Sequence, residues 1–277
     1  MYPEIDKPLN VNEILDDVHD LRIGGNLRYY TTAGSTNDIA YRLAEKGENE
    51  GVVVIADEQT AGKGRLNRNW ASPRFKGIYA SVLLRPEVDV LFASRFTMLA
   101  SISAARAIRE MTGISAQIKW PNDIVIGEKK TAGVLAEIKL KEKIIHFIII
   151  GIGINVNQLD GDFPKDIAAI ATSLLIEGGK SVSREKLTAK VLSSLDEMYP
   201  KALLTDFSPI ADEWKRLSPY HENCSVIIRN GDTSRRGITR GLTENGELIV
   251  EVRPGENIIV SYGDLMRVER DPYASRH

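Results

Sequence analysis

The sequence is poor in cysteine and histidine. Cys224 is the one cysteine among 277 residues, which excludes an internal disulfide and fits a reducing compartment. The four histidines match no metal-ligand spacing, so we expect no zinc site. No stretch approaches the roughly 20 apolar residues of a membrane helix, and the acidic first twenty residues do not resemble a signal peptide. We expect a cytoplasmic protein with no membrane partner.

A surplus of charge of either sign is also absent. The formal net charge is −2, so no basic field draws the chain to DNA, and we expect no nucleic-acid partner. Hydrophobic residues make up 43% of the sequence and charged residues 27%, as in ordinary globular proteins. The length allows one large domain and one small domain.

The segment that most clearly indicates chemistry is Asp57–Trp70, with the sequence D-E-Q-T-A-G-K-G-R-L-N-R-N-W. It follows an apolar run, Val52–Ala56, that predicts a buried strand. Glycines interleaved with basic residues offer backbone N–H groups beside positive charge, which suits a phosphate or a carboxylate. The alternative is a solvated surface turn. The spacing matches neither a Walker A loop nor a dinucleotide-binding fingerprint.

Helix and strand patterns cover most of the chain up to residue 219. We expect helices at 11–20, 35–47, 92–113, 184–198 and 207–217. We expect strands at 27–31, 52–56, 78–84, 124–126, 131–139 and 144–150. Ser35 is expected to cap the second helix, with Asp38 in the capping-box position.

The composition changes near Pro219. Short strands are expected at 224–229, 235–241, 247–252 and 257–261, separated by turn residues. Such a pattern predicts a small β-barrel of the SH3-like type. We therefore expect two domains, a catalytic domain at residues 1–219 and a C-terminal β-domain at residues 220–277.

Three more motifs accompany the glycine loop. They are Ser35-Thr36-Asn37, K-W-P-N-D-I-V-I-G-E-K-K-T-A-G at residues 119–133, and G-I-G-I-N at residues 151–155. In order and spacing the four motifs resemble those of the biotin–protein ligases, over roughly residues 27–270. One departure is Lys63, because the family usually has arginine there. The charge is kept but the planar fork is lost, so a backbone role is expected for Lys63.

The resemblance implies an α+β fold with a mixed, largely antiparallel sheet and flanking helices, related to class II aminoacyl-tRNA synthetases. It also implies two reaction steps. Biotin and ATP give biotinyl-5′-adenylate and pyrophosphate, and the biotinyl group then passes to a lysine of a biotin carboxyl carrier protein, of the acetyl-CoA or pyruvate carboxylase type. No helix-turn-helix pattern precedes Arg28, so we expect the monofunctional type rather than a repressor.

Residue chemistry agrees with this expectation. Attack of a carboxylate on a phosphate brings two anions together, so the site must supply positive charge, and Lys130 and Arg65 are the catalytic candidates. Mg²⁺ that bridges phosphates is held by few carboxylates, and Asp123 is the expected ligand. The alternative for Asp123 is a turn-capping role.

The expected ligand-binding sets combine the residue chemistry with what the resemblance implies, Asn155 being carried over from the family to read the adenine. A ureido ring has two N–H donors and one carbonyl, which need partners when buried. The biotin-binding set is Ser35, Thr36, Asn37, Gln59, Gly62, Lys63, Gly64, Arg65, Lys130 and Gly133. The ATP-binding set is Arg65, Arg68, Trp70, Asn122, Lys130 and Asn155. Trp70 forms an apolar wall or belongs to the core, and the glycines before Asn155 are expected to let the backbone approach the nucleotide.

Two other functions compete with this interpretation. A lipoate–protein ligase would share the fold and the adenylate step, but its R-R-x-x-G-G-G motif is absent. A non-catalytic biotin sensor would bind the ligand without ligating it. A homodimer through a sheet edge is compatible with the sequence, although no motif specifies it.

Overall fold

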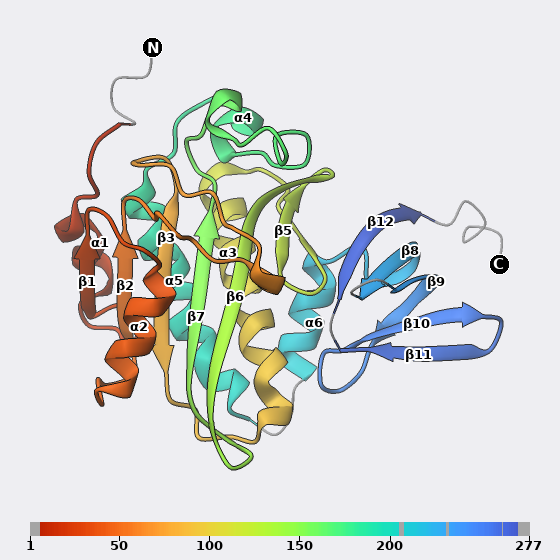
Figure 1. Cartoon of the computed structure of the whole chain (residues 1–277). Helices are drawn as coiled ribbons and strands as arrows, with labels where there is room; N and C mark the ends of the chain where they lie inside the picture. Colours follow the sequence, from red (N-terminus) through yellow and green to blue (C-terminus); the bar gives the residue numbers. More distant parts are fainter. Residues whose placement is uncertain (1–5, 205–207, 231–232, 262, 271–277) are drawn as a thin grey trace.

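A computed structural model of the chain describes residues 6–204, 208–230, 233–261 and 263–270. The backbone forms two β-sheets, with helices on both faces of the first sheet (Figure 1). No helix in these ranges is both long and apolar enough to cross a bilayer.

The first sheet has seven strands in the order β1-β2-β3-β7-β6-β5-β4. Their bounds are Asn26–Tyr30 (β1), Val52–Ala56 (β2), Ile78–Leu84 (β3), Gln117–Lys119 (β4), Asp123–Ile126 (β5), Lys129–Lys141 (β6) and Ile144–Ile154 (β7). Strands β1 and β2 are parallel, and the other neighbouring pairs are antiparallel. The mixed, largely antiparallel sheet that the sequence predicts is therefore confirmed.

The helices are divided between the two faces of this sheet. Their bounds are Val11–Val18 (α1), Thr36–Glu45 (α2), Ala93–Thr112 (α3), Leu174–Gly178 (α4), Arg184–Ala202 (α5) and Ser208–Leu217 (α6). Figure 1 shows α2 in front of the sheet and α3 and α5 behind it. The apolar side of α3 packs against β6 and β7, and α5 packs against α3. This rear layer forms most of the hydrophobic core.

Strand β7 shows why the two faces of the sheet differ. Its side chains alternate, so the even-numbered isoleucines of 148–154 point into the large core behind the sheet. Phe147 and Ile149 point the other way and pack under α2. The next residues on that front face are Gly151 and Gly153. Because they have no side chains, groups from other segments can lie close against the front of the sheet beyond Ile149.

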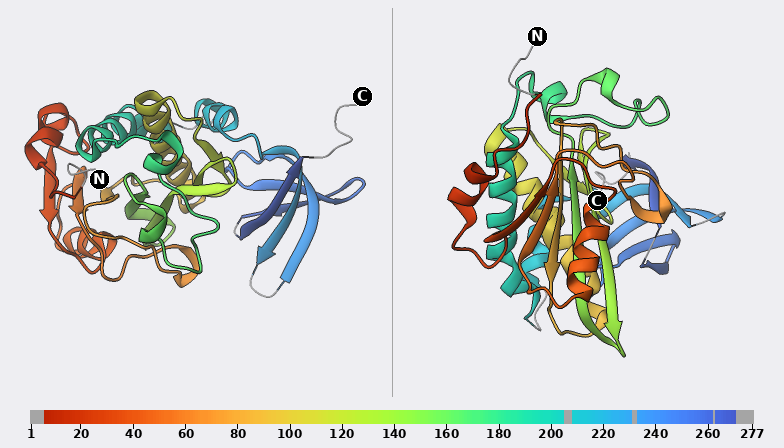
Figure 2. Two further views of the ribbon diagram at one scale, coloured as in Figure 1. Left: turned by 90° about the horizontal axis from the view of Figure 1, so that it is seen from above. Right: turned by 60° about the vertical axis from the view of Figure 1, so that its left-hand side comes forward.

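The second sheet contains β8 (Glu222–Asn230), β9 (Thr233–Leu242), β10 (Leu248–Arg253), β11 (Glu256–Val260) and β12 (Asp264–Arg270), in the antiparallel order β11-β10-β9-β8-β12. Seen from above, it lies beside the first sheet (Figure 2). Its buried side chains join the large core cluster, and the Trp120 indole donates to the Gly246 carbonyl at 3.3 Å. The two sheets therefore share one hydrophobic core.

Every helix and strand expected from the sequence is present, with shifted ends. Strand β7 continues to Ile154, so the first four residues of the G-I-G-I-N motif lie inside the strand and Asn155 follows its end. Strands β4 and β12 and the short helix α4 were not predicted.

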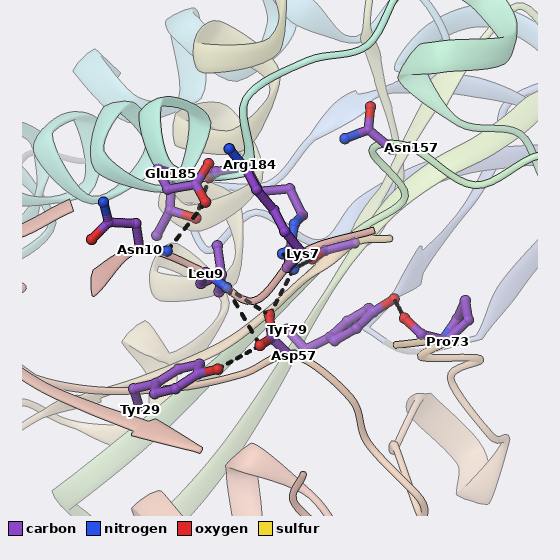
Figure 3. Close-up of polar contacts among 12 residues, drawn as sticks. Lys7, Leu9, Asn10, Tyr29, Asp57, Pro73, Tyr79, Asn157, Arg184 and Glu185 are labelled. Atoms are coloured by element: carbon purple, nitrogen blue, oxygen red, sulfur yellow. Dashed lines mark hydrogen bonds and ion pairs between the residues drawn. The ribbon is translucent and has the colours of Figure 1, made fainter. Parts of the chain in front are cut away.

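A buried ion pair lies where the chain leaves β2 (Figure 3). Arg184 Nη1 is 2.9 Å from Asp57 Oδ1, and the two side chains are 4% and 0% exposed. The same nitrogen lies 3.4 Å from the Gly77 carbonyl oxygen, so Arg184 holds both ends of segment 57–77. The Tyr29 hydroxyl donates to Asp57 at 2.5 Å, and burial together with this carboxylate raises the pKa of Tyr29 to about 12.

Candidate active site

A large cavity lies on the front face of the first sheet. The empty space in it is about 1220 Å³, a figure that includes open solvent. Every residue expected in the site lines this cavity except Gly62: Ser35, Thr36, Asn37, Gln59, Lys63, Gly64, Arg65, Arg68, Trp70, Asn122, Asp123, Lys130, Gly133 and Asn155. The four sequence motifs thus converge on one space.

The segment between β2 and β3 folds back on itself over this cavity. The Trp70 N–H donates to the Gly62 carbonyl at 2.9 Å, and the Gly64 N–H donates to the Arg68 carbonyl at 2.7 Å. Gly62 lies behind the cavity wall, where a Cβ would come within 2.5 Å of the Trp70 carbonyl oxygen. Glycine is therefore needed at this position for chain packing, and the expected ligand contact of Gly62 is not supported.

Ser35 precedes α2 as expected, but its side chain makes no capping hydrogen bond. The capping box predicted with Asp38 is wrong, because Asp38 forms an ion pair with Lys63. That hydrogen bond raises the pKa of Lys63. Lys63 therefore ties the glycine loop to α2, a side-chain role that the sequence did not indicate. The Ser35 hydroxyl is left at the cavity wall.

The other polar residues at this end of the cavity form hydrogen bonds with one another. The Thr36 N–H donates to Gln59 Oε1 at 2.8 Å, and Thr36 is only 3% exposed. Asn37 Nδ2 donates to Glu137 Oε2 at 2.6 Å, and Ser81 Oγ donates to Asn37 Oδ1 at 2.6 Å. Glu137 and Ser81 were not predicted, because each lies alone within a strand pattern.

Trp70 lies flat over two glycines that face each other across β6 and β7. A Cβ at Gly153 would lie 2.5 Å from Trp70 Cε2, and one at Gly133 would lie 3.3 Å from Cζ3. Likewise, a Cβ at Gly151 would collide with the Asn37 amide. The glycines of G-I-G-I-N therefore make room for side chains, and the approach of a nucleotide to their backbone stays a prediction.

The position of the Trp70 indole decides between the two expected roles of this residue, a part of the cavity wall or a part of the core. Its ring lines the cavity, and its Nε1 is buried without a hydrogen-bond partner among the described residues. Lys130 Nζ lies 5.3 Å from the ring centroid, in the range of a cation–π contact. Trp70 thus belongs to the cavity wall, between the polar end and the charged end.

Lys130 and Asp123 form an ion pair at the far end of the cavity. Lys130 Nζ is 2.6 Å from Asp123 Oδ1, and the side chains are 35% and 31% exposed. The Lys130 N–H donates to the Ile170 carbonyl at 2.8 Å, which joins β6 to the segment at 163–171. No three metal-binding side chains cluster within the described ranges. Asp123 would therefore be a single protein ligand to a phosphate-bound Mg²⁺ ion, as this ion commonly has.

Arg65 joins the tip of the loop to two other parts of the molecule. Its Nη1 donates to Asn122 Oδ1 at 3.1 Å and lies 3.4 Å from the Gly263 carbonyl oxygen of the second sheet. Asn122 in turn donates to the Val134 carbonyl. Arg68 is exposed and lines the cavity. Arg65 Nη1 is therefore held at the cavity wall by two oxygen acceptors, the Asn122 side-chain oxygen and the Gly263 carbonyl oxygen.

Asn155 is buried at the base of the cavity. Its Nδ2 donates to the Thr172 carbonyl at 3.0 Å, and its Oδ1 accepts from Gln158 Nε2 at 3.2 Å. The amide thereby fixes the segment that precedes α4. The sequence missed that segment, of which Phe163, Ile167, Ile170 and Ala171 line the cavity. Apolar residues at 163, 167 and 170 are its only signal, and the segment forms neither a regular α-helix nor a strand.

The site residues follow one another across the sheet. Thr36 and Asn37 lie by Ser81 of β3 and Gly151 of β7. The ring of Trp70 covers β7 and β6, and the Lys130–Asp123 pair joins β6 to β5. The cavity therefore has a polar end, where the Lys63 ammonium is paired with Asp38, an aromatic centre, and a second charged pair at the far end. It suits a long ligand with a neutral polar head and an anionic tail.

Comparison with known proteins agrees with this geometry. Residues 30–155 match the Biotin/lipoate A/B protein ligase family. The bifunctional ligase/repressor BirA of Bacillus subtilis is 35% identical over 263 residues, which span 94% of this chain and 80% of the relative. The biotin–[acetyl-CoA-carboxylase] ligase of Mycobacterium tuberculosis is 30% identical over 240 residues, 85% of this chain and 86% of the relative.

Among solved structures, a biotin protein ligase from Aquifex aeolicus in complex with biotin and ATP has the same fold. The two chains superpose with a TM-score of 0.74 at 31% identity, over 89% of this chain and 99% of the other.

Proposed function

Since this chain belongs to the biotin–protein ligase family, we propose that it joins biotin to a carrier protein in two steps within the cavity described above. Biotin and ATP give biotinyl-5′-adenylate and pyrophosphate, and the biotinyl group is then transferred to a lysine. The observation that carries this proposal is the order of polar, aromatic and charged groups across one cavity.

Biotin is placed with its ureido ring at the polar end. Ser35, Thr36 and Gln59 offer hydroxyl and amide groups there, which can pair with two N–H donors and a carbonyl. The apolar part of biotin would then run along Trp70 toward Lys130. This direction brings the biotin carboxylate to the charged end, where the nucleotide phosphates are placed.

In the first step, the biotin carboxylate attacks the α-phosphorus of ATP. A new P–O bond forms as the bond to pyrophosphate breaks, and negative charge increases on the phosphate oxygens. Lys130 and Arg65 stabilise this charge from two sides of the cavity. Lys130 would exchange its Asp123 partner for the phosphate.

Mg²⁺ would neutralise the phosphates of ATP during this step, and Asp123 is the carboxylate placed to hold it. The release of Asp123 from Lys130 would free this carboxylate when the nucleotide binds. Arg68 and Asn122 are assigned to the phosphates and the ribose, and Asn155 to the adenine.

In the second step, the ε-amino group of a carrier lysine attacks the carbonyl carbon of biotinyl-5′-adenylate. An amide bond forms, and AMP leaves with the electrons of the broken C–O bond. We propose a biotin carboxyl carrier protein as the acceptor, because a relative is named for acetyl-CoA carboxylase. The catalytic groups all come from residues 1–219, with Gly263 of the second sheet in contact with Arg65.

The experiment that tests this proposal follows transfer to a carrier domain. Purified protein, ATP, Mg²⁺ and biotin should add one biotinyl group to an isolated carrier domain, detected by mass spectrometry. A carrier whose target lysine is replaced by arginine should stay unmodified. Transfer of a lipoyl group at an equal rate would favour the lipoate ligase instead.

A further inference from the structure

A chain of hydrogen-bonded side chains runs behind the polar end of the cavity. At one end the Trp70 carbonyl oxygen lies 3.1 Å from Ser72 Oγ, and at the other the Glu137 carboxylate lies 2.6 Å from Asn37 Nδ2. Between them lie Gln59, Thr36 and Ser81. A carbonyl and a carboxylate can only accept hydrogen bonds. The direction of each bond along the chain therefore follows from its two ends.

From the Trp70 end, the single proton of Ser72 goes to the carbonyl oxygen. Ser72 Oγ must then accept from Gln59 Nε2, which lies at 2.9 Å. This fixes the Gln59 amide with Oε1 toward the Thr36 N–H. An amide NH₂ group has two hydrogens, so one remains for the cavity that Gln59 lines. Gln59 therefore presents a donor to a ligand.

From the Glu137 end, the carboxylate turns Asn37 Nδ2 toward itself and Oδ1 toward Ser81. The single proton of Ser81 is then used for Asn37. Because Ser81 Oγ also lies 2.7 Å from Thr36 Oγ1, that short contact needs the Thr36 proton. The contact from Thr36 Oγ1 to Gln59 Oε1 is longer, at 3.0 Å, and takes the smaller part of the hydrogen bonding of the one Thr36 hydroxyl proton. Thr36 Oγ1 thus keeps its lone pairs for the cavity.

We propose that Glu137 is a positioning residue for biotin recognition, which makes the Thr36 hydroxyl a hydrogen-bond acceptor toward the cavity. It acts through Asn37 and Ser81. Glu137 is half-buried on β6 and is itself absent from the cavity wall. An acceptor at Thr36 beside a donor at Gln59 matches the N–H and carbonyl of a ureido group. The inference rests on the proposed function and explains how the site rejects rings without that N–H.

Without the Glu137 carboxylate, the direction of the hydrogen bonds from Asn37 to Thr36 should no longer be fixed. The Asn37 amide could then rotate by half a turn and donate to Ser81, whose proton would pass to Thr36. The Thr36 proton would no longer be needed for Ser81 and could go to Gln59 Oε1, 3.0 Å away, or to an acceptor in the cavity. The site would accept either a donor or an acceptor from the ligand, and its selectivity would fall.

The test compares binding of biotin with binding of an analogue in which a ring oxygen replaces one ureido N–H. Both positional isomers are titrated by calorimetry, which does not depend on catalysis. The wild type should prefer biotin over the sensitive isomer on the order of ten- to a hundredfold, the effect of one unpaired buried group. In Glu137→Met this preference should fall by roughly tenfold. Glu128→Met, at an exposed carboxylate in the turn after β5, should keep the wild-type preference.

Two more variants separate this role from a general loss of structure. Ser81→Ala breaks the hydrogen-bond chain between Asn37 and Thr36 and should lower the preference for biotin as much as Glu137→Met does. Adding Glu137→Met to Ser81→Ala should lower the preference no further. Glu137→Gln keeps an acceptor oxygen and should preserve most of the preference.

The possible results distinguish this inference from the proposed function. If the wild type does not bind biotin, the proposed function is wrong. Suppose that the wild type binds biotin, and that both Glu137→Met and Ser81→Ala keep its preference for biotin over the analogue. The proposed action of Glu137 on Thr36 through Asn37 and Ser81 is then wrong. If Glu137→Met does not fold, an unchanged preference in Ser81→Ala alone contradicts the inference.

Discussion

Lys130 Nζ lies 2.6 Å from Asp123 Oδ1, so the expected phosphate-binding ammonium and the expected Mg²⁺ ligand are paired with each other. About a third of each side chain is exposed, at 35% and 31%. An ion pair of this exposure contributes only about 0–1 kcal/mol to stability. Under the proposed function, ATP and Mg²⁺ would therefore replace the pair at little cost.

Lys130→Ala should lower the rate of adenylate formation by on the order of 10²–10³, because a preorganised charge is lost where negative charge develops. Single-turnover formation of biotinyl-5′-adenylate measures this rate. Lys129→Ala is the matched control, because Lys129 is exposed one residue earlier on the same strand. A near-native rate in Lys130→Ala would remove Lys130 from the catalytic groups.

Asp123→Asn should raise the Mg²⁺ concentration needed for half-maximal rate, because a neutral amide binds a hard cation more weakly than a carboxylate. A titration of Mg²⁺ at saturating ATP measures the change. The protein should remain folded, since about a third of each side chain of the lost ion pair is exposed. An unchanged titration curve would show that Asp123 is not a ligand and would leave it only its pairing with Lys130.

Gly153→Ala should displace the Trp70 ring from β7, because the new Cβ would lie 2.5 Å from Trp70 Cε2. Overpacking of this kind costs about 1–3 kcal/mol, and the cavity wall would move with the ring. We expect weaker biotin binding with a modest loss of stability, measured by calorimetry and urea unfolding. Gly161→Ala is the control, since a Cβ there meets nothing within 4 Å. Equal biotin affinity in the two variants would contradict the packing described here.

Arg184→Met should destabilise the protein by about 3–5 kcal/mol, because it leaves the Asp57 carboxylate buried without its cation. Urea unfolding measures this loss. Lys186→Met, an exposed change on the same helix, should stay within about 0.5 kcal/mol of the wild type. A loss below about 1 kcal/mol in Arg184→Met would mean that the pair does not hold segment 57–77 as described.

The sequence predicted the location of the site because each motif lies where a strand begins or ends. Ser35 to Asn37, for example, stand at the start of α2, after β1, and Lys130 follows the turn after β5. Residues at such places can be recognised from turn and capping signals along the chain. Their meeting in one cavity then follows from the order of strands in the sheet.

Contacts between distant segments could not be predicted in this way. Asp38 carries a local capping signal, but the ammonium of Lys63, far along the chain, binds its carboxylate instead. Gly153 signals close approach without showing that the approaching group is Trp70. Glu137 lies mid-strand, and only its contact with Asn37 shows its importance. Tertiary contacts decide each of these cases.

Biotin-dependent exchange of pyrophosphate into ATP tests the central claim most directly, because it requires reversible formation of biotinyl-5′-adenylate and no carrier protein. With Mg²⁺, radioactive pyrophosphate should enter ATP only when biotin is present, and lipoate should not replace biotin. Lack of exchange with biotin, or equal exchange with lipoate, would contradict the account.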